Sequence, residues 1–401
     1  MATRLAILTR GSRTKLLVVC SILSRQVFFN NVNWLSDVPN LPVTRYEYTF
    51  ETYPGDFWFD FRVKREHIRD WYLAFGFVDG EIKSFFLLLH VFHLLCFAYL
   101  SDEFIKTDNG SIFYGEFAFM FILKRLSSLC ALVELEVIFG REHTQLSRIQ
   151  DHLIERLYGQ HSWLVINNMD YFAQRFLLYN TKILNRVTPP TPEGVQRVVS
   201  FTDCHVSQIC RPEDNENLQN SVYNGMNRVH ALKFTATGGP DGILQNLGVV
   251  AGRRHDRIGL RNSRINTKLE SAQNNRGAPA LQQGITYVDK GFVNLSHVRA
   301  AFHGVNVLVW QMVENIKMKR PRGVGIEMPF CKILQNSKIV GWWRGRKIQL
   351  NSVAKVFYLA VIFCNVHTCT YGSEVSEYFD CLPPTVYSYM RCPARGIQIN
   401  I

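Results

Sequence analysis

The stretch Phe201-Thr-Asp-Cys-His-Val-Ser-Gln-Ile-Cys-Arg-Pro212 carries an acidic residue, Asp203, behind an apolar, β-branched run that begins at Val198. A second apolar run, residues 243–250, leads in the same way to Asp256. Such runs are typical of buried strands. A carboxylate at the exit of a buried strand lies on rigid scaffold at the rim of a sheet, where α/β folds assemble their sites. We therefore expect these two acids, joined by others, to form a site at that rim.

Composition bounds the class of protein. The 401 residues are too many for one ordinary domain and suggest two or three. Lysine and arginine number 45 against 33 acids, a net charge of +12, which favours a polyanionic partner. The ten cysteines include no CxxC pair, which indicates reduced thiols in an intracellular protein. The segment Cys364-Asn-Val-His367-Thr-Cys369 lies in an apolar, helix-like run, so we expect buried thiols there and not zinc.

Two segments could be mistaken for targeting or membrane-spanning sequences. Residues 1–36 contain five basic residues and no acid, a composition that resembles a transit peptide or signal anchor. Residues 84–100 are rich in Phe and Leu, but they include two histidines and fall short of the ~20 residues that a spanning helix needs. We expect a buried core helix there and no membrane partner. A helical membrane-associated protein is the weakest of three hypotheses.

A pair of helices is predicted around Gly140. A short apolar helix ends at Phe139-Gly140, because glycine takes a left-handed cap without steric cost. A second helix starts near His143 and turns Leu146, Ile149 and Leu153 inward. Its outward residues are polar or basic: Thr144, Gln145, Ser147 and Arg148. This pattern is typical of a DNA-binding helix-turn-helix, with an ordinary helical hairpin as the alternative.

The clearest boundary is Thr188-Pro-Pro-Thr-Pro192, because its three prolines can continue neither helix nor sheet. Everything before it is predicted to be helical, and strands are predicted after it. The expected divisions are a poorly defined segment 1–60, a helical region 61–187 with the helix-turn-helix-like pair, a linker 188–192, a strand-containing domain 193–384 that carries the candidate acids, and a tail 385–401.

The order of elements after the boundary predicts an α/β fold. Residues 228–237, a turn at Gly238-Gly-Pro-Asp-Gly242 and residues 243–250 form two strands of an antiparallel set of three. A basic helix is expected at 257–269, a fourth strand at 284–288 before Asp289, a helix at 310–319, a broken stretch at 320–325 and a buried helix at 353–370. Pro329 is tolerable only in a first helical turn, which places Glu327 at a helix start. This order is that of a ribonuclease H-like mixed sheet with helices on both faces.

Clustered carboxylates persist when a cation is shared among them, and hard divalent ions such as Mg²⁺ prefer oxygen ligands. A pair of such ions would stabilise the attacking and leaving oxygens of a phosphodiester displacement. In a plain ribonuclease H-like core, Asp203 and Asp289 would meet Glu327 and leave Asp256 peripheral. Asp256 would otherwise serve as a helix N-cap or dipole partner, and Asp289 as a turn residue.

Several short motifs resemble one family. They are Asp203-Cys-His-Val206, Cys210-Arg-Pro212, Tyr223-Asn-Gly225, Val229-His-Ala-Leu-Lys233, Gly252-Arg-Arg-His-Asp256, Tyr287-Val-Asp289, Ile326-Glu-Met-Pro-Phe330, Cys369-Thr-Tyr-Gly372 and Ser376-Glu-Tyr-Phe-Asp380. Together they resemble the PIF/Harbinger transposases and the nucleases derived from them, most strongly from about 201 to 384. Upstream, Phe139-Gly-Arg141 and Gln145-Leu-Ser-Arg-Ile149 are similar to that family's helix-turn-helix.

The resemblance implies a ribonuclease H-like fold, DNA cleavage with strand transfer, and four ligands for Mg²⁺ or Mn²⁺: Asp203, Asp256, Asp289 and Glu327. It also implies a nuclear location and a separate Myb-like DNA-binding protein as a partner. Two positions depart from the family's pattern. Cys204 stands where glycine is usual, and Gly323 stands where an arginine usually precedes the glutamate by four residues, with Arg322 one step away.

Basic residues surround two of the candidate acids. Arg253, Arg254 and Arg257 flank Asp256, and a second basic run between 317 and 347 flanks Glu327. Lysine and arginine neutralise backbone phosphates largely without regard to sequence. The sequence thus predicts a metal-dependent, DDE-type nuclease or transposase that acts on double-stranded DNA, with no assigned oligomeric state. The alternative is a catalytically inactive, transposon-derived DNA-binding protein.

Overall fold

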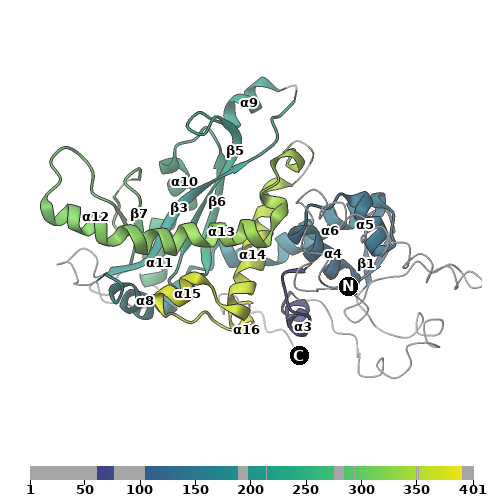
Figure 1. Ribbon diagram of the computed structural model, residues 1–401, viewed down its shortest axis with the longest axis horizontal. Helices are drawn as coiled ribbons and strands as arrows, with labels where there is room; N and C mark the ends of the chain where they lie inside the picture. The colour runs from purple at the N-terminus through teal and green to yellow at the C-terminus, as the bar shows by residue number, and fades with distance from the viewer. Residues whose placement is uncertain are drawn as a thin grey trace, which may run out of the picture. The chain divides into compact units, whose positions relative to one another are not determined.

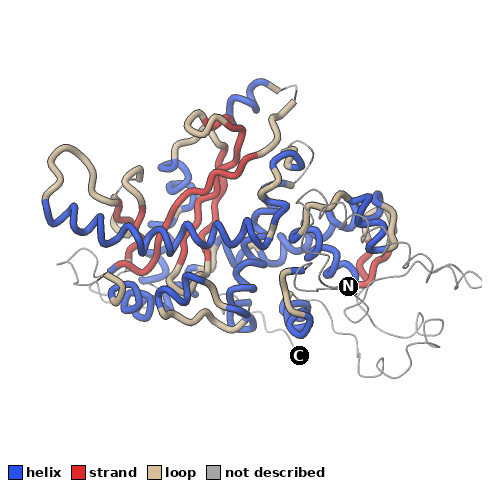
Figure 2. The backbone as a smooth tube through the Cα atoms, viewed as in Figure 1, coloured by secondary structure: helices blue, strands red, loops and turns tan. Residues whose placement is uncertain are grey.

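The computed structural model describes residues 61–75, 104–187, 197–213, 215–274, 284–292, 294–348, 350 and 352–390. They belong to one compact unit, Tyr48–Ile401, with an α/β fold that combines a mixed sheet with many helices (Figures 1 and 2). The predicted targeting segment at 1–36, the apolar run 84–100 and the linker 188–192 lie outside the described residues, as do segment 1–60 and most of the tail.

The sheet is built on β3, the strand that contains Asp203. Its six strands are β3 (Val198–Gln208), β4 (Tyr223–Asn224), β5 (Val229–Gly238), β6 (Leu244–Ala251), β7 (Ile285–Val288) and β8 (Val298–Ala300). The predicted antiparallel set of β3, β5 and β6 is confirmed, because β5 pairs with β3 on one side and with β6 on the other. On the far edge of β3, β7 and then β8 add in parallel. The sequence did not predict β4 or β8, which are too short to show an alternating pattern.

Successive side chains of β3 point to opposite faces of the sheet. Phe201 packs against Gly325 on one face, since a Cβ at Gly325 would lie 2.2 Å from the Phe201 ring. His205 is on that same face, stacked on Phe330 at 5.0 Å and on Phe357 at 5.9 Å. Cys204 faces the other way, with its sulfur 4.0 Å from the carbonyl oxygen of Asp256. Helices therefore cover both faces of the sheet.

One long helical run crosses the sheet in Figure 1. It comprises α12 (Val309–Arg322), a five-residue π-helical turn η8 (Gly323–Glu327) and α13 (Met328–Asn336). The predicted break at 320–325 is therefore wrong, because the chain stays helical through it, whereas the helix start predicted at Glu327 is confirmed to within one residue: α13 begins at Met328 with Pro329 in its first turn. Prolines lack the N–H that an α-helix needs and normally break it. Here the turn widens, and the Met328 N–H donates to the Gly323 oxygen five residues back.

Region 61–187 contains the helices α3 (Arg65–Ala74), α4 (Gly115–Ser127), α5 (Leu132–Phe139), α6 (His143–His161), α7 (Trp163–Ile166) and α8 (Met169–Leu184). The pair around Gly140 has the predicted bounds, and Gly140 has the expected left-handed conformation with φ 64°. The region is not all-helical, however. A hairpin of β1 (Phe104–Lys106) and β2 (Ile112–Tyr114) was not predicted, and its turn contains Asn109-Gly110.

α8 is joined to the sheet by a buried carboxylate. Asp241, in the turn between β5 and β6, is fully buried and accepts hydrogen bonds from the hydroxyls of Tyr179 and, at 2.8 Å, Tyr171. The Arg175 Nε lies 3.4 Å from the same carboxylate. This contact ties a helix that precedes the proline-rich stretch to the sheet that follows it, and the predicted division into domains stays a prediction.

The helix α14 (Val353–Tyr371) is nearly all apolar, and it packs in the core as the sequence predicted. Its Phe357 stacks on Phe234 of β5 with ring centroids 3.8 Å apart. Within the described segments it is the one helix long and apolar enough to cross a membrane, but 72% of its most apolar window is buried inside the protein. Its Cys364 is a buried free thiol, in agreement with the prediction.

The remaining helices are α9 (Glu216–Val222), α10 (Asp256–Ser263), α11 (Ile265–Asn274), α15 (Glu374–Phe379) and α16 (Val386–Met390), with short 3₁₀ turns η9 (Lys338–Val340) and η10 (Trp343–Gly345). The single basic helix predicted at 257–269 is in fact two. Arg264 has φ 53° and ends α10, because a left-handed residue cannot continue a right-handed helix.

Candidate active site

Two neighbouring strands carry the first two acids to one place. Thr202 of β3 pairs in parallel register with Val288, the last residue of β7, so Asp203 and Asp289 follow at the same level of the sheet. The hydroxyl of Thr202 hydrogen-bonds Thr286 of β7 at 2.8 Å, which fixes this register. Asp289 lies at a strand exit, as expected. Asp203 does not, because β3 continues to Gln208 and places it in the middle of the strand.

The π turn brings the third acid to the same face. Two glycines let the turn lie directly against the sheet: a Cβ on Gly238 would lie 2.3 Å from the Gly325 oxygen, and one on Gly325 would lie 2.2 Å from the Phe201 ring. A side chain at either position would push the helix away. Glu327, two residues after Gly325, is thereby held beside Asp203, which occupies the same face of β3 as Phe201.

The three carboxylates converge on the guanidinium of Arg322. Its Nη1 lies 3.2 Å from the Asp203 Oδ2, and its Nη2 lies 3.4 Å from the Glu327 Oε1 and 4.0 Å from the Asp289 Oδ1. We call these four residues the Arg322 cluster. Arg322 and Glu327 are five residues apart, which is one turn of a π-helix, so both side chains leave the helix on the same side. Sequence reasoning had treated Arg322 as displaced by one position, because a π turn cannot be foreseen from spacing alone.

Burial and charge act on Asp203 in opposite directions. Burial is the main cause that raises its pKa, to about 6, and the nearby acids Asp289 and Glu327 raise it further. The N–H of Cys204, which donates to Asp203 Oδ1 at 2.7 Å, and the Arg322 guanidinium lower it. The side chain of Asp203 is 25% exposed against 58% for Glu327, so the cluster is buried at the sheet and open toward the helix side.

Asp256 is held elsewhere, by Lys233. Its Oδ1 lies 2.8 Å from the Lys233 Nζ. On β5 Lys233 shares a face with Thr235, whose hydroxyl contacts the Cys204 sulfur at 3.1 Å, so it lies on the opposite face from Asp203. Asp256 also lies in the first turn of α10, where a carboxylate interacts favourably with the helix dipole. The structure thus brings together Asp203, Asp289 and Glu327, and leaves Asp256 apart.

The donor set suits a hard divalent cation in kind. Asp203, Asp289 and Glu327 offer carboxylate oxygens and already share one cation, Arg322, and oxygen ligands of this kind are those that Mg²⁺ or Mn²⁺ prefers. The carboxylates are nevertheless arranged around a guanidinium, which is wider than a metal ion. In the part of the chain that the structure describes, no group of three or more histidines, cysteines or acids is close enough to hold a metal as it stands.

The basic residues divide into exposed and structural ones. Arg253, Arg254 and Arg257 around Asp256 are exposed, as are Arg261 and Arg264 of the same segment. Three basic residues from the two predicted runs instead support the fold. Arg346 is buried and donates to the Gln208 oxygen at 2.8 Å, Lys332 donates to the Gly372 oxygen at 2.7 Å, and Lys268 donates to Asn246 Oδ1 at 2.7 Å.

The start of α6 has the predicted surface. Thr144 and Arg148 are exposed, Gln145 is half-buried, and Leu146, Ile149 and Leu153 are fully buried. The Glu136 carboxylate of α5 bonds to His143 at the start of α6, 2.5 Å from its Nδ1, and so fixes the angle between the two helices. Polar side chains are thus presented on a rigid support.

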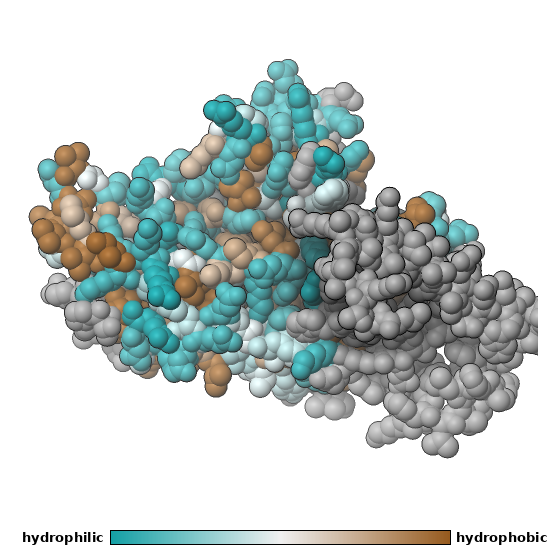
Figure 3. Space-filling view, viewed as in Figure 1, coloured by the Kyte–Doolittle hydropathy of each residue, from teal (hydrophilic) through white to brown (hydrophobic). Residues whose placement is uncertain are grey.

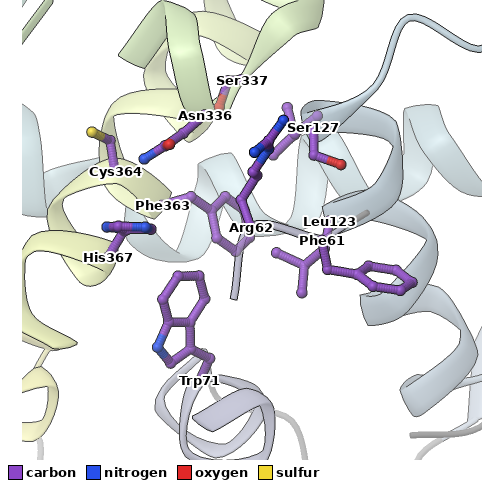
Figure 4. A pocket seen from close by; sticks show the side chains of 11 residues that line it. Phe61, Arg62, Trp71, Leu123, Ser127, Asn336, Ser337, Phe363, Cys364 and His367 are labelled. Atoms are coloured by element: carbon purple, nitrogen blue, oxygen red, sulfur yellow. The ribbon is translucent and has the colours of Figure 1, made fainter. Parts of the chain in front are cut away.

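Two other surface features lie away from the Arg322 cluster. A small pocket opens between α3, α4 and α14, where Trp71, Asn336 and His367 line it (Figure 4), and none of the candidate acids does so. Apolar side chains gather over the beginning of α12 (Figure 3). Those exposed there are Val305, Leu308, Val309, Trp310, Met312, Val313 and Ile316. Exposed apolar surface of this extent is typical of contact surfaces.

Comparison of the chain with family models, with curated proteins and with solved structures gave no match.

Proposed function

We propose that this protein is a metal-dependent nuclease that acts on double-stranded DNA through a ribonuclease H-like core. The observation that carries the proposal is the convergence of Asp203, Asp289 and Glu327 on one cation, although 124 positions separate the first from the last in the chain. Acids from a central strand, a neighbouring parallel strand and a helix place three sets of carboxylate oxygens around one point, the kind of ligand that a divalent cation prefers.

The strand order supports the fold. An antiparallel set of three strands, followed by a strand that pairs in parallel with the first, with helices on both faces, is the arrangement predicted for a ribonuclease H-like domain, and β8 extends it. In such a domain the first-strand acid and the fourth-strand acid would meet the acid of the late helix. The three acids of the Arg322 cluster are consistent with those positions.

Each residue then has a separate role. Asp203, Asp289 and Glu327 would hold Mg²⁺ or Mn²⁺, which supplies Lewis acidity and a low pKa of bound water when present. Arg253, Arg254 and Arg257 would neutralise phosphates of the DNA backbone. Thr144, Gln145 and Arg148 would contact DNA through the helix-turn-helix-like pair. Asp256 would remain paired with Lys233 and orient the basic segment that contains these arginines.

The resemblance to PIF/Harbinger transposases extends the proposal to strand transfer, a nuclear location and a Myb-like partner. Pull-down of tagged protein from nuclei, with the partner identified by mass spectrometry, tests the last two together. Recovery from cytoplasm alone, with no DNA-binding partner, would count against both.

A catalytically inactive DNA-binding protein is the second candidate. The specific observation that favours it is Arg322, whose charge already compensates the three acids without a metal. A protein that had lost catalysis could keep such a cluster for stability and retain its exposed arginines for DNA.

A cleavage assay separates the two candidates. Purified protein is incubated with supercoiled duplex DNA and Mg²⁺ or Mn²⁺, beside Asp203→Asn and a control, Asp380→Asn, which alters an exposed carboxylate paired with Lys182. Cleavage that Asp203→Asn abolishes and Asp380→Asn preserves supports the nuclease. DNA binding without cleavage, unchanged by Asp203→Asn, supports the inactive protein.

A further inference from the structure

The Arg322 cluster holds a cation before any metal arrives. The guanidinium contacts one oxygen of each of three carboxylates, and its side chain is only 16% exposed. Arginine cannot lose its proton in a protein. A divalent ion that binds these carboxylates therefore meets an occupied place and must displace a permanent positive charge.

We propose that Arg322 is a built-in competitor of the metal: it closes the carboxylate cluster when no ion is bound, and it must swing out before Asp203, Asp289 and Glu327 can share a divalent cation. This inference rests on the proposed nuclease function and adds the regulation of its site. Two observations support it. The three carboxylates share the Arg322 guanidinium, and in the described part of the chain no three possible ligands lie close enough together to hold a metal ion.

The local backbone gives this exchange a physical route. Arg322 precedes the π turn and Glu327 ends it, so both ends of the contact lie on the one irregular turn of the long helix. Position 323 is a glycine, so no side chain stands there, and apart from its chain neighbours and the local helix backbone the nearest atom to a Cβ there would be the Glu327 Oε2 at 3.8 Å. The exchange would be a rotation of the Arg322 side chain, which is 16% exposed, toward solvent.

DNA would favour the release. A backbone phosphate offers the guanidinium another anion, and arginine binds phosphate through two parallel hydrogen bonds. The cost of moving the charge would then fall when DNA is present. Metal would bind weakly to the free protein and more tightly to its complex with DNA, which restrains cleavage until the substrate is in place.

The test is direct measurement of metal binding, without DNA and without activity. Mn²⁺ binding to the full chain is measured by electron paramagnetic resonance and calorimetry for wild type, Arg322→Gln and Lys319→Gln. The last variant removes the same charge from an exposed position of the same helix. We expect Arg322→Gln to bind Mn²⁺ more tightly than Lys319→Gln, by between about 5-fold and 150-fold, the usual range of coupling between sites.

Thermal unfolding provides a second readout. Without metal, Arg322→Gln leaves three acids uncompensated and should have a lower Tm than wild type, whereas added Mn²⁺ should raise its Tm by more than that of wild type. If Arg322→Gln does not fold without metal, Arg322→Lys keeps the charge but loses the fork that reaches several acids. It should then bind Mn²⁺ with intermediate affinity.

The outcomes separate the role of Arg322 from the proposed nuclease function. Mn²⁺ binding that requires Asp203 but is equal in all residue-322 variants and the Lys319→Gln control overturns the role of Arg322 and leaves the nuclease standing. The same holds if Arg322→Gln binds Mn²⁺ more weakly than wild type. If no variant shows Mn²⁺ binding that is lost in Asp203→Asn, both the role of Arg322 and the proposed nuclease function are overturned.

Discussion

The close contact between the π turn and the sheet can be tested at Gly325. The turn lies against β3 and β5 because neither Gly238 nor Gly325 has a side chain, and a Cβ on Gly325 would meet ring atoms of Phe201 at 2.2, 2.7 and 3.0 Å. Phe201 is fully buried, so its ring has no free space into which to move. In Gly325→Ala the helix must shift away from the sheet, and Glu327 shifts with it.

The expected magnitude follows from two opposing effects. Overpacking of a well-filled core costs about 1–3 kcal/mol. Replacing a helical glycine by alanine returns about 0.5–1 kcal/mol through the lower entropy of the unfolded chain. Gly323→Ala is a matched control in the same turn, since its Cβ would lie no closer than 3.8 Å to any atom other than those of its two chain neighbours and the local helix backbone. The gain from replacing glycine is common to both variants, so the control should be neutral or slightly stabilising and the two variants should differ by the overpacking cost alone, about 1–3 kcal/mol.

Urea unfolding followed by circular dichroism measures this difference. A lower midpoint for Gly325→Ala at an unchanged m-value reports a loss of stability and not a change in the unfolded state. Mn²⁺ affinity should also fall in Gly325→Ala and not in Gly323→Ala, because only the first moves Glu327. Equal stability of the two alanine variants would refute the argument that the glycine positions the acid.

Three further outcomes follow from named contacts. Asp256→Asn should lower DNA cleavage by less than about 10-fold, because substitution of a residue that does not bind the metal itself costs less than loss of a ligand. Asp203→Asn should abolish cleavage. Equal losses in a cleavage assay would place Asp256 among the ligands. Asp241→Ala should lower the free energy of unfolding by about 3–5 kcal/mol, because it leaves the buried partners of this carboxylate uncompensated, and a loss under about 1 kcal/mol in urea unfolding would contradict that role. Burial, with a smaller effect of nearby Lys332, lowers the pKa of His367 from 6.5 to about 3, so the folded state prefers the neutral ring. Below pH 6.5 the unfolded state binds a proton at His367 that the folded state does not, so the stability that the neutral ring contributes is complete above pH 6.5 and is lost as the pH falls toward 3. The Tm of His367→Phe should therefore decrease less than that of wild type over this pH range.

The strands could be predicted where the pattern was long. Each of β3, β5 and β6 has eight or more residues of apolar or alternating sequence, and the turn Gly238-Gly-Pro-Asp-Gly242 joins the last two as expected. Strands of two to four residues show no period, which is why β4, β8 and the β1–β2 hairpin were missed. The equally short β7 was recognised as an apolar run, residues 284–288, that ends at Asp289. The helices around Gly140 were predictable because the left-handed Gly140 marks the end of α5, and an apolar stripe marks the buried face of α6.

The carboxylate cluster was predictable only in part, for a reason that concerns the long helix. Asp203 and Asp289 were recognised from their positions after apolar strands, and Glu327 from the helix start that Pro329 indicates. The cation among them was not recognised, because side chains five residues apart do not face each other on an α-helix. They do so here through the π turn, which Pro321 on one side and Pro329 on the other favour by withholding two α-helical hydrogen bonds. A π turn adds one residue to a helical turn, so Arg322 and Glu327 acquire the relation that residues four apart would have in an α-helix. Arg322, and not the residue at position 323, therefore reaches Glu327, and Gly325 of the same turn lies against Phe201 of β3.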